Sequence, residues 1–190
     1  MGLVIGLHGA KGSGKDQFYK AVKAAFPHLK IRKIAYADPI KHEICHIFDL
    51  VDEEQYDLFK RTKVEYRLPG YLTHFVDGRR IVREIGMLMR KYDEDQFTQY
   101  VQDQIKADPE AIWCITDLRF DNELASIRQI GGIVIKIKRG GVDFDGHVTE
   151  TEFDNKDCDY VIHNVDLSLE QYNQLAVKEM KKILQTIAIN

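Results

Sequence analysis

The chain has 190 residues, of which 44% are hydrophobic and 30% are charged, and its formal net charge at pH 7 is −3. This length and composition predict one globular domain with a substantial core, and the slightly negative charge argues against a general nucleic-acid binder, which is usually basic. The three cysteines are widely separated and lack C-x-x-C spacing, so we expect neither zinc binding nor a disulfide framework, and a reducing compartment fits them.

The sequence shows neither a leader pattern nor a membrane-spanning pattern. Its first residues run directly into an apolar strand pattern without a basic region or a cleavage site. No apolar run approaches the length needed to cross a membrane. We therefore expect a cytoplasmic protein that has neither nucleic acid nor a membrane among its partners.

The first predicted elements are a short buried strand over residues 3–7, a glycine-rich loop and a helix over residues 15–26. Residues 9–15 read Gly-Ala-Lys-Gly-Ser-Gly-Lys, which is the G-x-x-x-x-G-K pattern of a phosphate-binding loop in its required strand–loop–helix context. In such a loop the backbone N–H groups and the helix N-terminus favour an anion. Lys15 would bring its charge to the β- and γ-phosphate oxygens of a nucleotide.

Asp16 departs from the usual pattern, because a Ser or Thr hydroxyl that binds Mg²⁺ normally follows the lysine. A carboxylate can hold Mg²⁺ directly or through a water molecule, so Asp16 is a candidate magnesium ligand. The alternative is that Asp16 only stabilises the start of the helix, where negative charge is favourable.

A second strand is predicted over residues 31–37 and a helix over 39–48, with Asp38 as N-cap and Pro39 at the first helical position. Lys41 lies in the first turn of this helix, which is an unusual place for a cation. It could bind a substrate anion or simply be solvated, and the residues alone leave both readings open.

Residues 49–80 are the least regular part of the sequence and predict a substrate-binding or lid insertion within the single domain 1–190. A short helix begins near Asp52 and ends near residue 62, and the aromatic stretch 66–78 resembles a covering loop. Seven cations belong to this insertion or follow it directly: Lys60, Arg61, Lys63, Arg67, Arg79, Arg80 and Arg83. Most of them are expected to be solvated, but Arg83 opens a strongly apolar helix and is therefore a candidate for binding phosphate.

A second helix is predicted over residues 94–107, and a buried third strand over 111–116 is followed by Asp117 and Arg119. Ligands of open α/β sheets bind at the carboxyl ends of the strands, so both residues are predicted to lie at the site. Asp117 could act on Mg²⁺ through water or on a substrate hydroxyl, and Arg119 could bind phosphate. The alternative is a mutual ion pair combined with a helix cap.

The rest of the chain continues the alternation of strands and helices. A helix is predicted over residues 121–130, strands over 133–137 and 159–163, and a closing helix whose capping box starts at Ser168. Its predicted buried stripe comprises Leu169, Tyr172, Ala176, Met180, Ile183 and Ile187. His147 has no second ligand at metal spacing and is not expected to bind a metal. The pattern predicts a three-layer α/β fold with a mainly parallel sheet.

Among proteins with a phosphate loop, the other motifs favour a small-molecule kinase. The N-K-x-D motif with which GTPases recognise the base is absent, because Cys158 occupies the position of its aspartate. The strand over 111–116 also lacks the terminal acidic pair that is usual in ATPase motors. A kinase positions two anionic substrates and neutralises the charge between them, so it needs little covalent chemistry from the protein.

The chain resembles the phage-type deoxynucleoside monophosphate kinases over most of its length. The matching motifs are Gly-Ala-Lys-Gly-Ser-Gly-Lys-Asp at 9–16, Ala-Asp-Pro-Ile-Lys at 37–41, the Arg83 helix, Thr-Asp-Leu-Arg-Phe-Asp-Asn-Glu at 116–123, Lys-Arg-Gly at 138–140, His-Val-Thr-Glu at 147–150 and Asp-Tyr-Val-Ile-His-Asn at 159–164. The resemblance implies a P-loop kinase fold with about five parallel strands and helices on both faces. It also implies host cytoplasm as the location if the protein is encoded by a phage, and it is compatible with a homodimer.

The resemblance further implies roles for individual residues. ATP would contact Gly12, Ser13, Gly14, Lys15, Asp16 and Gln17, with Arg139 as a weaker candidate. The deoxynucleoside monophosphate would contact Lys11, Ile40, Lys41, Arg83, Asp117, Arg119, Glu123 and Glu150. Lys15, Arg83, Asp117 and Arg119 would carry catalysis.

The implied reaction transfers the γ-phosphate of ATP, bound with Mg²⁺, to a deoxynucleoside monophosphate. Gln17, and Arg90-Lys91 after the Arg83 helix, depart from the family pattern and leave the base preference open. Two alternatives remain: a kinase for another small acceptor of the phosphomevalonate or dephospho-coenzyme A kind, and an ATP-binding regulator without turnover.

Overall fold

The computed structural model describes residues 2–66, 74–141 and 157–189. Contacts between Cα atoms divide the chain into two compact units. We call residues 1–35 and 101–190 the sheet unit, and residues 36–100 the helical unit. The organisation expected from the sequence, one domain with an insertion over 49–80, stays a prediction.

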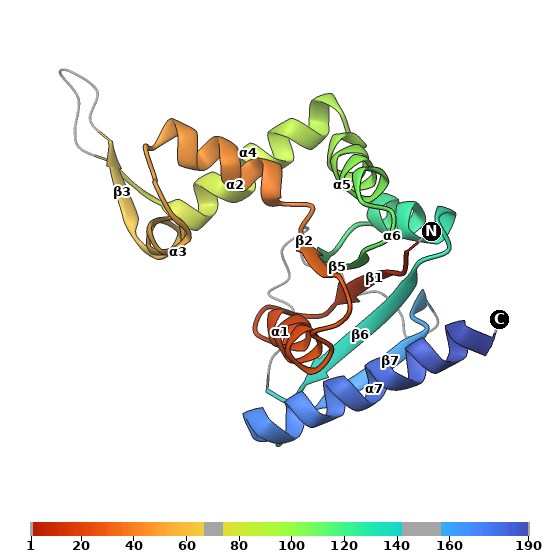
Figure 1. The fold of residues 1–190 in the computed structure, drawn as a ribbon. Coiled ribbons are helices and arrows are strands. Elements are labelled where there is room, and N and C mark those ends of the chain that lie inside the picture. The colour runs from red at the N-terminus through yellow and green to blue at the C-terminus, as the bar shows by residue number, and fades with distance from the viewer. Residues whose placement is uncertain (1, 67–73, 142–156, 190) are drawn as a thin grey trace. The chain divides into compact units, whose positions relative to one another are not determined.

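The sheet unit is built on five parallel strands in the order β2-β5-β1-β6-β7 (Figure 1). In chain order the strands are β1 (Val4–His8), β2 (Ile31–Ile34), β5 (Ile112–Leu118), β6 (Ile133–Arg139) and β7 (Tyr160–Asn164). Every neighbouring pair is parallel, which confirms the predicted α/β fold with a five-stranded sheet. β1 lies in the centre, so the residues that follow it come to the middle of the carboxyl edge.

Helices cover both faces of this sheet. α1 (Lys15–Ala25) and α7 (Leu169–Ile189) pack together on the face to which Ile5 and Leu7 of β1 contribute. α6 (Asp121–Gln129) packs on the opposite face, where Gly6 leaves room for the side chain of Ile127. The result is the predicted three-layer arrangement.

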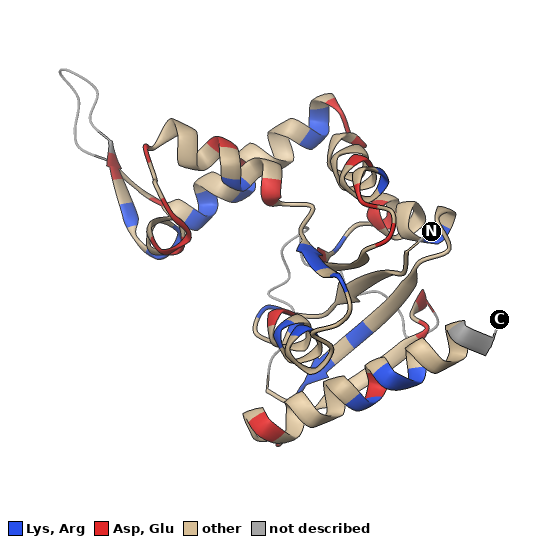
Figure 2. Cartoon of the chain, in the orientation of Figure 1, with Lys and Arg blue, Asp and Glu red and all other residues tan. Residues whose placement is uncertain are grey.

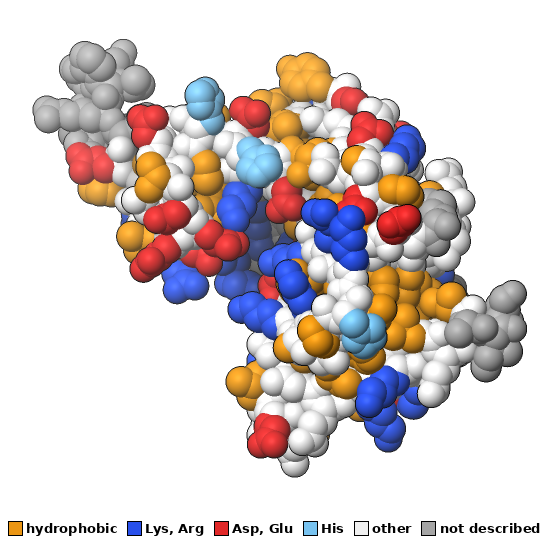
Figure 3. Space-filling view, in the orientation of Figure 1, with side chains coloured by type: hydrophobic (Ala, Val, Ile, Leu, Met, Phe, Trp, Pro, Cys, Tyr) orange, Lys and Arg blue, Asp and Glu red, His pale blue; other side chains and the backbone are white. Residues whose placement is uncertain are grey.

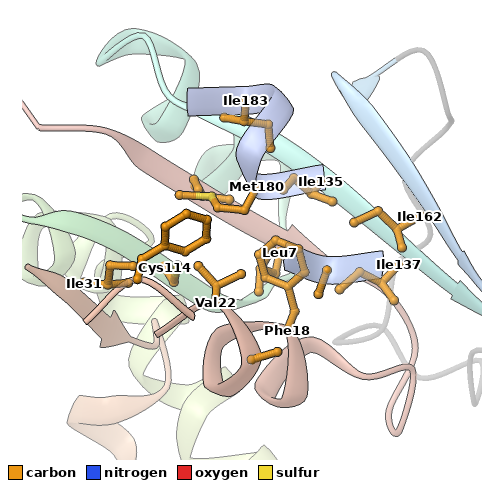
Figure 4. Packing of buried hydrophobic residues seen from close by; sticks show 14 of the residues in the cluster. Leu7, Phe18, Val22, Ile31, Cys114, Ile135, Ile137, Ile162, Met180 and Ile183 are labelled. Carbon is orange, nitrogen blue, oxygen red and sulfur yellow. The ribbon is translucent and has the colours of Figure 1, made fainter. Parts of the chain in front are cut away.

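The core between the sheet and the helix pair is shown in Figure 4, in which Phe18 and Val22 of α1 point toward the strand residues. Four members of the predicted α7 stripe are buried, but Leu169 and Ile187 are 65% and 44% exposed, so the prediction was wrong for these two. α7 has 21 residues and is roughly 30 Å long, whereas strands of five to seven residues span about 17–23 Å. The ends of the helix therefore extend beyond the strands.

The predicted boundaries moved by a few residues at several places. β5 ends at Leu118 rather than at 116, so Asp117 lies inside the strand and not after it. α2 (Asp38–Ile47) has Ala37 as its N-cap without a side-chain cap bond, so the prediction of Asp38 as the cap was wrong. Asp38 still lies in the first turn, where its charge favours the helix. The capping box is confirmed, because Ser168 and Gln171 exchange hydrogen bonds between side chain and backbone.

The helical unit contains α2, α3 (Glu53–Arg61), α4 (Gly78–Tyr92) and the first residues of α5 (Gln96–Ala107). Asp52 and Asp77 cap α3 and α4, accepting hydrogen bonds from the backbone N–H groups of Gln55 and Arg80. α4 packs against α2 and α3. Close packing on α2 is possible because Gly86 has no side chain, and a Cβ there would lie 2.8 Å from Ile40.

A two-stranded antiparallel sheet joins α3 to α4. Its strands are β3 (Lys63–Tyr66) and β4 (His74–Asp77), and the described register pairs Val64 with Val76. The covering loop predicted over 66–78 therefore includes a strand that the sequence reading missed, while residues 67–73 lie outside the described part. No helix that the structure describes has the length and hydropathy required to span a membrane.

Candidate functional site

The phosphate loop connects β1 to α1 at the carboxyl edge of the sheet. The N–H of Ser13 donates to the carbonyl oxygen of Ala10 at 3.1 Å, which closes a tight turn within the loop. Gly9 has a φ of 150°, and a Cβ there would lie only 2.4 Å from the carbonyl oxygen of Ile137. The loop therefore requires glycine at this position, and the helix that follows presents its N-terminus to an anion.

The ammonium of Lys15 lies against this loop. It donates to the carbonyl oxygens of Gly9 at 2.5 Å and Ala10 at 2.9 Å, so its Nζ atom is held at the turn rather than in bulk solvent. The positive charge therefore lies beside the loop, where it could contact the β- and γ-phosphates of a bound nucleotide.

Three side chains from the C-terminal third of the chain donate to other carbonyl oxygens of the loop. Arg139 donates from Nη1 to Gly12 at 2.9 Å, Asn164 from Nδ2 to Ser13 at 2.9 Å, and the hydroxyl of Tyr172 to Gly14 at 3.0 Å. The sequence predicts an ATP contact for Arg139 and a core position for Tyr172, but no role for Asn164. A single sequence contains no signal for these contacts, because the partners are more than 100 residues apart.

Ser13 contributes a buried hydroxyl to the loop. The residue is 1% exposed, and its Oγ atom has no hydrogen-bond partner among the residues that the structure describes. Buried polar atoms are nearly always hydrogen-bonded, so a hydroxyl of this kind indicates a place where a ligand or a water molecule completes the site. The buried hydroxyl of Ser13 is thus a second indication, besides the sequence pattern, that the loop binds a phosphate chain.

The two residues after Lys15 form contacts with other parts of the sheet unit. The carboxylate of Asp16 pairs with the ammonium of Lys33 at 2.7 Å, and the side-chain amide of Gln17 donates to Asn173 at 2.7 Å. Magnesium in kinases is bound mainly by substrate phosphates and waters together with one or two carboxylates, and Asp16 can supply one. In the described part of the chain no three His, Cys, Asp or Glu side chains gather as a metal site.

The end of β5 brings a second set of predicted residues to the same edge of the sheet. Leu118 is paired with His8, the last residue of β1, and His8 bonds to the Leu118 carbonyl oxygen through Nδ1 at 3.0 Å. Asp117 and Arg119 flank Leu118 and so lie at the carboxyl edge together with the phosphate loop. This agrees with the topological expectation for both residues.

Glu123 has a structural role that its sequence motif does not predict. It is fully buried, and its carboxylate accepts hydrogen bonds from the backbone N–H groups of Arg119 at 2.8 Å and Phe120 at 3.2 Å. These bonds fix the turn that presents Arg119. The predicted contact of Glu123 with the acceptor stays a prediction, and Glu150 lies outside the described residues.

Two lysines of the helical unit lie over the ring of a buried tyrosine. The ammonium groups of Lys41 and Lys60 lie 5.6 and 4.4 Å from the ring centroid of Tyr56. Burial raises the pKa of Tyr56 to about 12, and the charge of Arg79 acts against this rise. We call Lys41, Lys60 and Arg79 the cation cluster. Because the phenol stays neutral up to high pH, the ring can face the cations without adding a charge.

Acidic residues of α3 balance this cluster. Lys41 pairs with Glu53 at 2.9 Å and Lys60 with Asp57 at 2.6 Å, and Figure 3 shows acidic side chains gathered over α3. The proximity of Lys60 holds the pKa of Asp57 below its usual value.

Arg83 lies on α4, along which basic residues recur (Figure 2). It is the sixth residue of the helix, so the prediction that it opens the helix was wrong. The start was misplaced because the apolar run begins later than the cap at Asp77. Arg83 follows Arg79 by one turn and is half-buried. Ile40, Lys41 and Arg83 belong to the helical unit, whereas the other predicted contacts that are described belong to the sheet unit.

Comparisons with known proteins show the family to which this chain belongs. The family model for Deoxynucleotide monophosphate kinase matches residues 85–175. A curated protein of Acanthamoeba polyphaga mimivirus, described as "Putative deoxynucleotide monophosphate kinase", is 30% identical over 188 residues, which cover 91% of this chain and 94% of the relative. The chain belongs to the deoxynucleotide monophosphate kinase family.

A solved structure shows the same fold at lower identity. The dephospho-CoA kinase from Campylobacter jejuni is 17% identical, with a TM-score of 0.53 over 96% of this chain and 98% of that chain. The resemblance stated from the sequence motifs is thus confirmed. This member of the family is a kinase, an ATP-dependent phosphotransferase whose co-substrate is ATP.

Proposed function

We propose that this kinase transfers the γ-phosphate of ATP to the phosphate of a deoxynucleoside 5′-monophosphate, which gives ADP and a deoxynucleoside diphosphate. The observation that carries the proposal is the family relationship, which extends over 91% of the chain. The phosphate loop with Lys15 held against it supports the proposal independently. The description of the relative supplies the substrate class, and the loop supplies the site for the donor.

Each side of the reaction has its own set of residues in this proposal. The loop amides, Ser13, Lys15, Asp16 and Gln17 hold ATP, and Arg139 supports the loop through Gly12. Bound Mg²⁺ would neutralise the charge of the phosphates, with Asp16 as the protein carboxylate beside them. Lys11, Ile40, Lys41, Arg83, Asp117, Arg119, Glu123 and Glu150 remain the proposed contacts of the acceptor.

The proposed transfer needs no general base, because the phosphate of the acceptor is already ionised at pH 7. One of its oxygens attacks the γ-phosphorus as the bond from that phosphorus to the β–γ bridging oxygen breaks. The task of the protein is to hold the two oxygens in line and to offset the negative charge with Lys15, Arg83 and Arg119.

The proposal is tested by a coupled assay of ADP release with ATP–Mg²⁺ and a panel of acceptors. The panel contains the four common deoxynucleoside monophosphates, their ribose counterparts and dephospho-coenzyme A. We expect release with at least one deoxynucleoside monophosphate and none with dephospho-coenzyme A. Release with only dephospho-coenzyme A would replace the substrate class, and ATP binding without release for any acceptor would indicate a regulator.

A further inference from the structure

The carbonyl oxygens of residues 12–14 are all bonded by side chains from distant parts of the sheet unit. Two of the donors, Asn164 at the end of β7 and Tyr172 in α7, are 8% and 2% exposed. They donate to the carbonyl oxygens of Ser13 and Gly14 from 151 and 158 residues away. Both donors are neutral: Asn164 donates from an amide, and Tyr172 donates from a phenol. Burial raises the pKa of Tyr172, so its hydroxyl keeps the proton that it donates.

These hydrogen bonds determine where the neighbouring amides point. A peptide bond is planar and trans, so its N–H points opposite to its C=O, and no cis peptide occurs among the described residues. A carbonyl of Ser13 that is held by Asn164 therefore directs the N–H of Gly14 away from Asn164. In the same way Tyr172 fixes the peptide whose N–H belongs to Lys15.

The contact is close as well as polar. A Cβ on Gly14 would lie 3.0 Å from Nδ2 of Asn164 and 3.0 Å from two ring carbons of Tyr172. The φ of Gly14 is 114°, a conformation that other residues rarely adopt. The first turn of α1 contributes to only one of the two carbonyls, because the N–H of Phe18 donates to Gly14 at 2.8 Å. The orientation of the Ser13 carbonyl depends on Asn164.

We propose that Asn164 and Tyr172 are positioning residues for the phosphates of ATP. They act through the loop backbone and do not contact the nucleotide. By holding the carbonyls of Ser13 and Gly14 on one side, they keep the amides of Gly14 and Lys15 directed toward the bound phosphates. This pre-organises the loop before ATP arrives, so less ordering is required when the nucleotide binds.

Two substitutions separate this role from packing. Asn164→Asp keeps the shape of the side chain but replaces the donor with an acceptor that faces the Ser13 carbonyl. Tyr172→Phe keeps the ring in the core and removes only the hydroxyl. Tyr160→Phe on β7 is the matched control, because it removes a hydroxyl from the same strand that carries Asn164.

The measurement is the dissociation constant of ADP and of a non-hydrolysable ATP analogue, determined by calorimetry without any acceptor. We expect it to rise by about 10-fold for Asn164→Asp and about 3- to 5-fold for Tyr172→Phe, the range of one buried hydrogen bond. Tyr160→Phe should leave it unchanged. In turnover assays the KM for ATP should rise while the KM for the acceptor stays within about twofold.

A purely structural role predicts a different result. The variants would then lose thermal stability with unchanged nucleotide affinity, or lose affinity for donor and acceptor alike, and either result would overturn the inference. If Asn164→Asp does not fold, Tyr172→Phe decides alone, because its hydrophobic packing is intact. Since calorimetry requires no acceptor, the outcome holds whichever acceptor the panel identifies.

Discussion

The phosphate loop of the sheet unit and the cation cluster of the helical unit hold their positive groups in different ways. The loop uses backbone amides whose carbonyl partners are bonded by Arg139, Asn164 and Tyr172, together with a lysine held at the turn. In the cluster, the ammonium groups of Lys41 and Lys60 face one aromatic ring and are paired with carboxylates.

This difference has a physical consequence for binding. If the loop is pre-organised as we propose, its contribution to affinity depends on the hydrogen bonds that Asn164 and Tyr172 donate to it. Cations in exposed pairs must first exchange a carboxylate for the phosphate, and surface ion pairs contribute only a little free energy. We therefore expect substitutions at the loop to change turnover strongly, whereas substitutions at the cluster adjust acceptor affinity in small steps.

The largest expected effect is that of Lys15→Ala. Removing the ammonium takes away the charge beside the β- and γ-phosphates, and kcat should fall by roughly 10³-fold or more. Lys20→Ala on the same helix is the control, because Lys20 is exposed. Steady-state ADP release measures both variants. A Lys15→Ala protein with near-normal kcat would remove the loop from the proposed site.

The next effect concerns Arg83, the proposed acceptor contact on α4. Arg83→Ala should raise the KM for the acceptor about 10- to 100-fold, the range of a hydrogen bond to a charged group, and leave the KM for ATP within about twofold. Arg80→Ala removes the same charge from the same helix, but Arg80 is 72% exposed and paired with Glu84 at 2.6 Å. An equal effect of both variants would mean that only the net charge of α4 matters.

A smaller change of opposite sign is expected for Glu53→Gln. The carboxylate of Glu53 holds Lys41 at 2.9 Å and would repel an incoming phosphate. Its removal should lower the acceptor KM by about 2- to 5-fold, which corresponds to the free energy of one surface ion pair. Glu54→Gln makes the same charge change at the neighbouring exposed position. A rise in KM for Glu53→Gln would show instead that this carboxylate contacts the substrate.

The sheet unit was largely predictable because its signals are local. Continuous apolar runs mark β1, β5 and β6, and the glycine pattern marks the turn between β1 and α1. The strand ends at Leu118 and Arg139 were missed, because the predicted strands stopped before the charged residues Asp117 and Lys138, and charged residues are typical of loops. Polarity alone therefore ends a predicted strand too early.

The helical unit and the support of the loop were less predictable for two physical reasons. β3 and β4 have four residues each and mix charged with aromatic side chains, so their pairing has no strong periodic signal. Asn164 and Tyr172 are far from the loop in sequence and come next to it only when the sheet unit folds. The sequence identified the residues that form the phosphate loop but not those that orient its backbone.

The smallest expected effect tests the neutral ring beneath the cation cluster. Burial raises the pKa of Tyr56 to about 12, above the value of about 10 in an unfolded chain. The neutral phenol thus favours the folded state, and its contribution is fully present below pH 10 and is lost as the pH rises from 10 through 12. Between pH 9 and 11.5, the urea midpoint should fall less for Tyr56→Phe than for the wild type.

Tyr92→Phe is the control for that experiment, because Tyr92 is 82% exposed in the same unit. Lysines titrate over the same pH range in all three proteins, so the difference between the curves isolates the phenol. If Tyr56→Phe and the wild type lose stability in parallel, the ring does not stay neutral because of burial. A larger fall for Tyr56→Phe than for the wild type would mean that Lys41 and Lys60 stabilise a phenolate in the folded state, because a lowered pKa of Tyr56 would make the wild type gain stability relative to the variant as the pH rises.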